Sequence, residues 1–205
     1  MLNKALKGLH SGVEEHFSRG DLLFRDNSKS DHLYLVLEGK IKLNSKDEDG
    51  KEFIYQIANK GDIIGNLSLD AEAYHTYEAE ALCESQVLRF ESSEMHNLLS
   101  RNPELLTRYL SLMQSTLNYS RFLNHELANH NPEHNILRLL QYFKQKQQHL
   151  IESTGKLELT RQQIANMLGL RVETVIRVMK VLEEKNVLKI HRGKVFIPTE
   201  IHAEN

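Results

Sequence analysis

Apolar and polar residues alternate with a period of two through the first half of the chain, from Phe17 to Phe90, with glycines between the runs. Short alternating runs at regular spacing are typical of an antiparallel barrel or sandwich. The interior of so small a barrel either holds a small ligand or is filled by side chains. The expected strands are DLLF at 21–24, HLYLVLEG at 32–39, KIKLN at 40–44, EFIYQIA at 52–58, DIIGN at 62–66 and SQVLRF at 85–90, with a hairpin tip at 46–50.

A different pattern follows the strands, with apolar positions four and three residues apart. Asn102 and Pro103 suit the start of a helix, because Asn can cap it and Pro fits the first turn. The spacing is that of a coiled-coil seam, which predicts a dimerisation helix; packing of the helix on its own barrel is the alternative. Two polar seam positions favour the dimer, because they can specify register or receive a ligand. The seam residues are Leu106, Leu110, Met113, Leu117, Ser120, Asn124 and Leu127.

The seam ends at Asn131 and Pro132, where a new helix is expected to begin. The residue before a proline avoids the α region, so the chain must change direction at this point. Asn131 can cap the next helix and Pro132 occupies its first position. We therefore interpret Asn131 and Pro132 as a hinge between the part of the chain that precedes it, a candidate sensor, and the helices that follow it.

Two helical periods then lie on either side of Gly169, a pattern that predicts a helix-turn-helix. A tight turn between helices needs a positive φ, which glycine adopts at little cost. Thr160 and Gln163 have the spacing of a capping box, whereas Arg171 stands where a capping Ser or Thr is expected. The predicted buried positions are Ile164, Ala165 and Leu168 in the first helix and Val175, Val178, Met179 and Leu182 in the second.

The outward face of the second helix, together with a following basic hairpin, predicts a surface that reads DNA. Glu173 can accept from cytosine, Arg177 can contact guanine with two hydrogen bonds, and Val172 or Ile176 can touch a thymine methyl. A solvated helix face is the alternative, but alternating runs at 187–190 and 194–197 around His191, Arg192 and Gly193 indicate a wing. The predicted DNA-binding residues are Thr160, Arg161, Gln162, Arg171, Val172, Glu173, Ile176, Arg177, Lys180 and Arg192.

Charge divides the chain in the same way. Residues 1–135 hold 14 Lys and Arg against 21 Asp and Glu, a net of −7, whereas residues 136–205 hold 12 against 7, a net of +5. The basic part coincides with the helix-turn-helix, as contact with phosphates requires. The start of the chain lacks the apolar run of a signal peptide, and no stretch is long and apolar enough to span a membrane, so we expect a cytoplasmic protein without a membrane partner.

This order of elements resembles the cyclic AMP receptor and fumarate-nitrate reductase regulator family, the Crp/Fnr transcription factors. The resemblance rests on LYLVLEG at 33–39, KDEDGKE at 46–52, KGDIIGNLSL at 60–69 and LTRQQIANMLGLRVETVIRVMKVLE at 159–183. It implies an α+β fold with a cyclic-nucleotide-binding-like β-roll of the jelly-roll type at 1–101, a dimerisation helix at 102–131 and a winged helix-turn-helix at 132–205. It also implies a homodimer on a palindromic operator in double-stranded DNA, with RNA polymerase as a further partner.

The resemblance places an effector pocket at Gly65, Asn66, Leu67, Ser68, His75, Thr76 and Ser120. Cyclic AMP binders of the family have a Glu for the ribose and an Arg followed by Ser or Thr for the phosphate. Asn66 is a weaker partner for a ribose hydroxyl, and His75 does not replace a permanent two-pronged cation. Ile176 also departs from the small or hydroxylated residue common in the family, so we expect a shifted DNA specificity. The sequence therefore argues against cyclic AMP, and the effector, if there is one, is unknown.

Other cofactors and activities find little support in the sequence. The single cysteine, Cys83, excludes a cluster held by four thiolates and is expected to be a small buried residue, with a redox switch as the alternative. Haem would need histidines such as His32, His75 or His96. The break at Pro132 separates His125, His130 and His134, which argues against zinc. No catalytic arrangement stands out, so we expect no enzyme; a regulatory module that uses its winged helix for protein contacts remains the rival hypothesis.

Overall fold

The computed structural model describes residue 6, residues 12–65 and residues 73–198. The chain forms two compact units, residues 1–120 and 121–205, and each is described by itself. The long helix α3, Pro103–Ala128, begins in the first unit and ends in the second.

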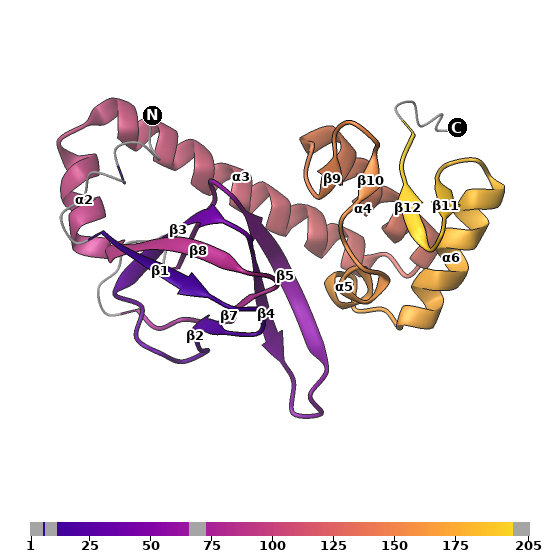
Figure 1. Ribbon diagram of the computed structural model, residues 1–205, viewed down its shortest axis with the longest axis horizontal. Coiled ribbons are helices and arrows are strands. Elements are labelled where there is room, and N and C mark those ends of the chain that lie inside the picture. Colours follow the sequence, from indigo (N-terminus) through magenta and orange to yellow (C-terminus); the bar gives the residue numbers. More distant parts are fainter. Residues whose placement is uncertain (1–5, 7–11, 66–72, 199–205) are drawn as a thin grey trace. The chain divides into compact units, whose positions relative to one another are not determined.

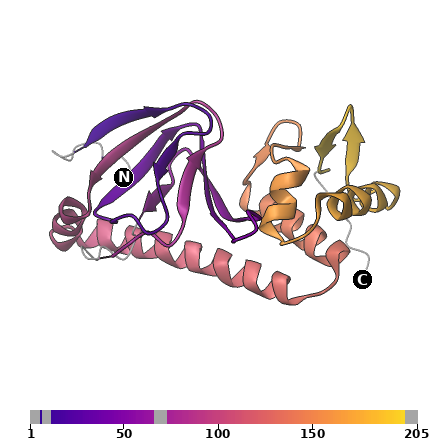
Figure 2. The same cartoon turned by 90° about the horizontal axis from the view of Figure 1, so that it is seen from below.

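The first unit contains two four-stranded antiparallel sheets that face each other (Figures 1 and 2). One has the order β1, β8, β3, β6 and the other the order β2, β7, β4, β5. The predicted antiparallel β-roll is thereby confirmed. The strands are β1 Val13–Phe17, β2 Leu22–Phe24, β3 His32–Glu38, β4 Lys40–Lys46, β5 Glu52–Asn59, β6 Ile63–Gly65, β7 Glu78–Ala81 and β8 Ser85–Glu91.

Alternation along β3 divides the core of this unit into two layers. Leu33 and Leu35 pack with α2, Ser92–Ser100, and with Tyr109 of α3. Tyr34 and Val36 point the other way, into a cluster between the two sheets. The period of two in the sequence therefore reports a sheet that is covered by helices on one face and by the second sheet on the other.

Strand β7 was not among the expected strands, because its sequence EAEA has low β propensity. Its place between β2 and β4 explains why it forms a strand. Ala79 and Ala81 are completely buried, while Glu78 and Glu80 on the opposite face pair with lysines of β4. The expectation of a buried Cys83 was wrong, because this residue lies in the exposed turn between β7 and β8.

The second unit contains three further helices and a small sheet (Figure 1). The sheet has the order β11, β12, β10, β9, so the predicted two-stranded wing is half of a four-stranded sheet. The sequence prediction missed β9 and β10 because each has only two residues. The elements are α4 Pro132–Lys146, β9 Leu150–Ile151, β10 Lys156–Leu157, α5 Arg161–Met167, α6 Val172–Glu184, β11 Lys189–His191 and β12 Lys194–Phe196.

The helix ends of this unit follow the predicted local chemistry. Thr160 and Gln163 form the capping box of α5, whereas Arg171 makes no side-chain capping bond to α6. Gly169 has a φ of +61°, the left-handed conformation expected for the turn between the helices. Asn131 caps α4 by accepting from two backbone amides, with Pro132 at the first position. These predictions are confirmed because each depends on residues that are close in the sequence.

Candidate nucleic-acid interface and ligand cavity

Helix α6 separates cleanly into a buried and an exposed face. The predicted core positions Val175, Val178, Met179 and Leu182 are all buried. A 13-residue helix is about 20 Å long, which suits insertion into a DNA major groove about 12 Å wide. The exposed positions carry both charges and one apolar side chain; they are Arg171, Glu173, Ile176, Arg177 and Lys180, with Val172 half-buried beside them.

Helix α5 contributes residues whose polar atoms are already engaged. The Thr160 hydroxyl accepts from the Gln163 amide at 3.1 Å. Gln162 is exposed and donates to the side chain of Asn166. Arg161 is half-buried, and its Nη1 donates to the Gly193 carbonyl of the wing at 2.9 Å. Arg161 therefore holds the wing against the start of α5.

The wing presents Arg192 at a tight turn. Strands β11 and β12 pair antiparallel, with Arg192 and Gly193 as the two residues between them. Their φ values of +48° and +74° fit a type I′ hairpin turn, which matches the twist of the strands. Arg192 is exposed at this turn, and the Glu183 carboxylate of α6 accepts from the Ile190 amide at 2.6 Å. The structure thus fixes an exposed cation relative to α6.

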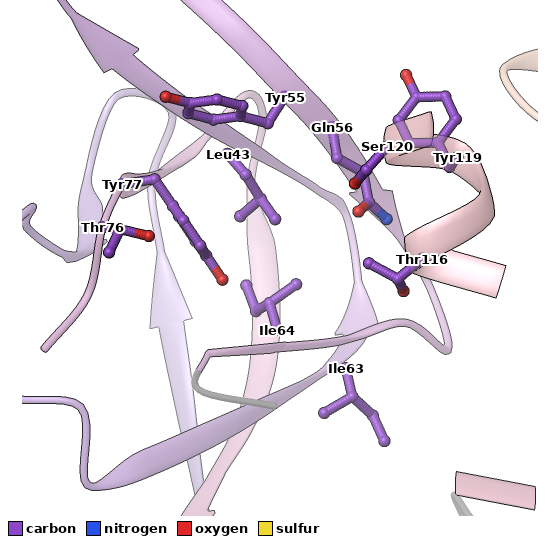
Figure 3. Close-up of a pocket in the computed structure, with 10 residues that line it drawn as sticks. All are labelled: Leu43, Tyr55, Gln56, Ile63, Ile64, Thr76, Tyr77, Thr116, Tyr119 and Ser120. Atoms are coloured by element: carbon purple, nitrogen blue, oxygen red, sulfur yellow. The ribbon is translucent and has the colours of Figure 1, made fainter. Parts of the chain in front are cut away.

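The first unit contains a cavity of about 350 Å³ between its strands and helix α3 (Figure 3). The aromatic rings of Tyr55 and Tyr77 form one wall, with their centroids 6.3 Å apart. Side chains of α3 form another wall. The lining residues are Leu43, Tyr55, Gln56, Ile63, Ile64, Thr76, Tyr77, Thr116, Tyr119 and Ser120.

None of these described lining residues carries a charge. The Tyr77 hydroxyl donates to the Gly65 carbonyl at 3.1 Å, and burial raises the pKa of Tyr77, so its phenol is neutral. The Tyr55 hydroxyl is 2.9 Å from the Ser45 hydroxyl. The Thr116 hydroxyl donates to the Leu112 carbonyl of its own helix. The cavity is therefore mainly apolar, with a few neutral polar groups.

Some of the predicted pocket residues lie at the cavity, some lie outside the described residues, and His75 lies elsewhere in the first unit. Thr76 and Ser120 line the cavity, and Gly65 borders it by accepting from Tyr77. The predicted pocket residues Asn66, Leu67 and Ser68 lie outside the described residues. The lining also includes residues that were not predicted, among them Tyr55, Gln56, Tyr77, Thr116 and Tyr119, although Thr116 and Tyr119 lie within one helical turn of Ser120.

His75 is not part of the cavity lining. Its ring is 4% exposed and stacks on Phe24, with the centroids 3.6 Å apart. Its Nδ1 lies 3.2 Å from the Ser30 hydroxyl. Burial lowers the pKa of His75, so the ring is neutral near pH 7. These contacts give His75 a place in the barrel core and not that of a phosphate-binding cation.

The predicted seam on α3 contains the most exposed leucines of the described chain. Leu106, Leu110 and Leu117 are 39%, 57% and 50% exposed. Met113 is half-buried against the core of the first unit, and Leu127 lies close to Gly169 in the second. Ser120 and Asn124 are exposed. The seam is thus an uncovered stripe whose Met113 and Leu127 also pack within the chain.

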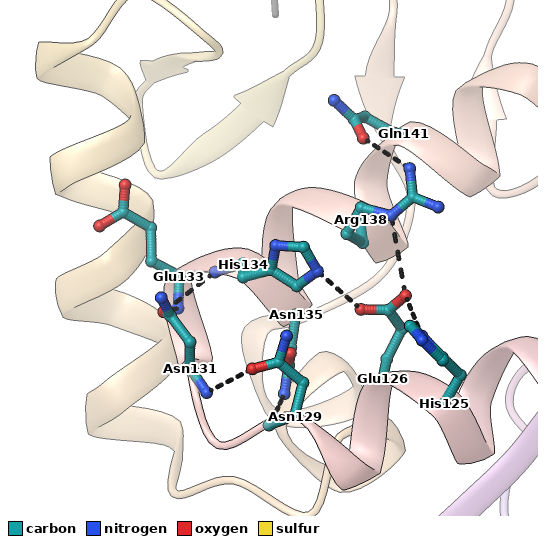
Figure 4. Close-up of polar contacts among 9 residues, drawn as sticks. All are labelled: His125, Glu126, Asn129, Asn131, Glu133, His134, Asn135, Arg138 and Gln141. Atoms are coloured by element: carbon teal, nitrogen blue, oxygen red, sulfur yellow. Dashed lines mark hydrogen bonds and ion pairs between the residues drawn. The ribbon is translucent and has the colours of Figure 1, made fainter. Parts of the chain in front are cut away.

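The turn between α3 and α4, where the hinge was predicted, is held by side chains (Figure 4). The side-chain amide of Asn135 donates to the backbone carbonyl of Asn129 at 2.7 Å, and the backbone N–H of Asn131 donates to the side-chain oxygen of Asn129. The Glu126 carboxylate is 1% exposed and lies 3.4 Å from His134 and 3.7 Å from Arg138. The carboxylate therefore joins the end of α3 to the first turns of α4.

Within the described residues, no group of three or more His, Cys, Asp or Glu is arranged to hold a metal ion. The described helices include none that is long and apolar enough to cross a membrane.

Comparison with known proteins agrees with this arrangement. Residues 14–102 match the cyclic nucleotide-binding domain, and residues 136–200 match the Crp-like helix-turn-helix domain. The cAMP-activated global transcriptional regulator CRP of Salmonella typhimurium is 29% identical over 192 residues, 92% of this chain and 90% of the relative. The nitrogen fixation regulation protein FixK of Bradyrhizobium diazoefficiens is 29% identical over 199 residues, 95% and 82% of the two chains.

The fold is similar to that of FixK2 from Bradyrhizobium japonicum, with a TM-score of 0.77 at 17% sequence identity. The alignment covers 91% of this chain and 92% of that structure. Because both domains match in the same order and the relatives align along most of the chain, this protein belongs to the Crp/Fnr family of transcription regulators, which bind DNA through a helix-turn-helix and are not enzymes.

Proposed function

We propose that this regulator binds an inverted-repeat operator as a homodimer and that cyclic AMP does not control it. The exposed face of α6 supports the DNA-reading part, because Glu173, Ile176 and Arg177 stand on the side opposite its buried residues. Arg177 suits two hydrogen bonds to a guanine, and Glu173 suits a cytosine amino group. Ile176, 40% exposed, suits a thymine methyl.

The uncovered stripe of α3 supports the homodimer. Leu106, Leu110 and Leu117 would be covered by the same residues of a second copy in a two-fold interface. A two-fold dimer places its two α6 helices in a symmetric arrangement, so it reads two half-sites of opposite orientation. A palindromic operator follows from this symmetry, and RNA polymerase is the further partner that we propose for the bound dimer.

The name of the CRP relative says that cyclic AMP activates that protein. The cavity of the present chain supports regulation that does not depend on cyclic AMP. A cyclic phosphodiester is a permanent anion, and its burial without a cation costs several kcal/mol. The described lining contains no charged residue. In the sequence, the whole stretch 63–77 contains no Lys or Arg, whereas it contains Asp70 and Glu72. The residues of the chain that would meet the phosphate are therefore unsuited to it.

The test is selection of bound sequences from a random DNA library by the purified full chain, with and without cyclic AMP. We expect an inverted repeat in both conditions, with affinity that falls steeply as salt rises. Recovery of the repeat only when cyclic AMP is present would contradict the proposal that cyclic AMP does not control the protein. If no sequence is enriched and affinity does not depend on salt, the winged helix contacts protein instead, and the first part is wrong.

A further inference from the structure

We propose that the cavity of the first unit binds an uncharged mono- or bicyclic ligand with a flat apolar body and one or two hydrogen-bonding groups. This inference deepens the proposed function, on which its regulatory meaning rests, by naming the class of effector. The cavity volume of about 350 Å³ lies at the small end of the range of ligand pockets, which is about 300–1,000 Å³.

Aromatic and aliphatic side chains of the lining favour a ligand with an apolar body. Tyr55 and Tyr77 offer aromatic surface, and the Tyr77 ring is backed by Phe24 at a centroid distance of 5.6 Å. Ile64 and Leu43, both buried, complete this side (Figure 3). Because the two tyrosine rings are tilted by 55°, a flat molecule can stack on the face of one ring and meet the other ring at an angle.

The polar groups in and near the lining favour a ligand without charge. The Tyr77 hydroxyl donates to the Gly65 carbonyl and the Tyr55 hydroxyl is hydrogen-bonded to the Ser45 hydroxyl, and a phenol supplies no positive charge to an anion. Two lysines of the same sheet, Lys42 and Lys46, pair with carboxylates of the neighbouring strand β7. A buried ion would lose its hydration without gaining a partner of opposite charge among the described lining residues.

Two polar side chains of the lining favour a ligand with one or two hydrogen-bonding groups. Gln56 of β5 and Ser120 of α3 both line the cavity (Figure 3). An amide and a hydroxyl both donate and accept, so they suit a neutral hydroxyl or carbonyl group. Thr116 and Ser120 also flank Leu117, an exposed seam residue. A ligand on this wall touches the helix that carries the seam, and its occupancy would thereby affect the dimer.

The test compares two fluorescent bicyclic probes that differ by one charge, 2-naphthol and naphthalene-2-sulfonate, on the full chain. We expect saturable binding of the uncharged probe, at least about tenfold tighter than that of the sulfonate, and no displacement by cyclic AMP. Thr116→Phe fills the cavity and should weaken the uncharged probe at least tenfold. Thr107→Phe is the matched control, since Thr107 lies on α3, is exposed, and makes the same bond to the carbonyl four residues earlier.

Gln56→Phe, on β5 and not on α3, serves as a second cavity-filling variant should Thr116→Phe fail to fold. Absence of saturable binding by the uncharged probe would overturn the inference. So would equal binding of both probes, or binding that neither filling variant weakens. Operator affinity is measured on the same proteins by fluorescence anisotropy. Probe binding without specific DNA binding refutes only the proposed function, and specific DNA binding without probe binding refutes only the ligand class.

Discussion

Replacement of Leu110 by alanine is expected to weaken dimerisation by about 30- to 100-fold. Leu110 is 57% exposed, and full burial of a leucine side chain contributes about 1.5–3 kcal/mol. The exposed share corresponds to about 0.9–1.7 kcal/mol in each protomer. A two-fold interface contains the residue twice, so the loss is about 2–3 kcal/mol, and each 1.4 kcal/mol corresponds to about a factor of ten.

The assay is sedimentation equilibrium over a dilution series, which gives the dimer dissociation constant directly. Ser115→Ala is the control, because Ser115 is exposed on the same helix and outside the seam spacing. The fold of the protomer should be unchanged, since Leu110 contributes little to its core. An unchanged dissociation constant for Leu110→Ala would refute the seam, and the operator would then not have to be palindromic.

Three further changes test separate features. Arg177→Ala should lower operator affinity by about 1–3 kcal/mol and relax discrimination at one guanine in competition assays; an equal loss on all sequences contradicts the base contact. Burial lowers the pKa of His75, so the unfolded chain takes up the proton first and stability falls as pH drops below about 6.5. His75→Phe should therefore flatten the fall of the unfolding free energy from about pH 7 to 5 in urea titrations, and an unchanged slope contradicts this. Arg138→Ala should lower the unfolding free energy by about 1–2 kcal/mol, because Glu126 stays buried while the half-exposed arginine is lost; equal stability contradicts the ion pair.

The helix-turn-helix could be predicted in detail because its signals are local. The capping box of Thr160 and Gln163, the positive φ of Gly169 and the uncapped Arg171 each depend on a few adjacent residues. The split of α6 into two faces follows from its helical period alone. In contrast, β7 could not be found, because its strand conformation depends on β2 and β4, which are distant in sequence.

The lining of the cavity was predicted less completely than the exposed face of α6. His75 was placed in it from its position in the chain, but its ring stacks on Phe24, a residue about fifty positions away. Such a contact leaves no periodic signal in the sequence. The exposure of Cys83 was missed for a similar reason, since a turn that is fixed by the strands on either side carries no helical or strand period.

The difference between the two surfaces bears on what a family relationship transmits. The reading face of α6 is one contiguous segment of 13 residues, so an alignment compares it position by position. The cavity is assembled from β4, β5, β6, the 76–77 segment and α3, and a few substitutions in these separate segments change its charge without changing the fold. A relative at 29% identity therefore supports the DNA-binding role more strongly than it supports a shared effector. We propose that the neutral lining found among the described residues lets the same fold respond to a ligand other than the one named for that relative.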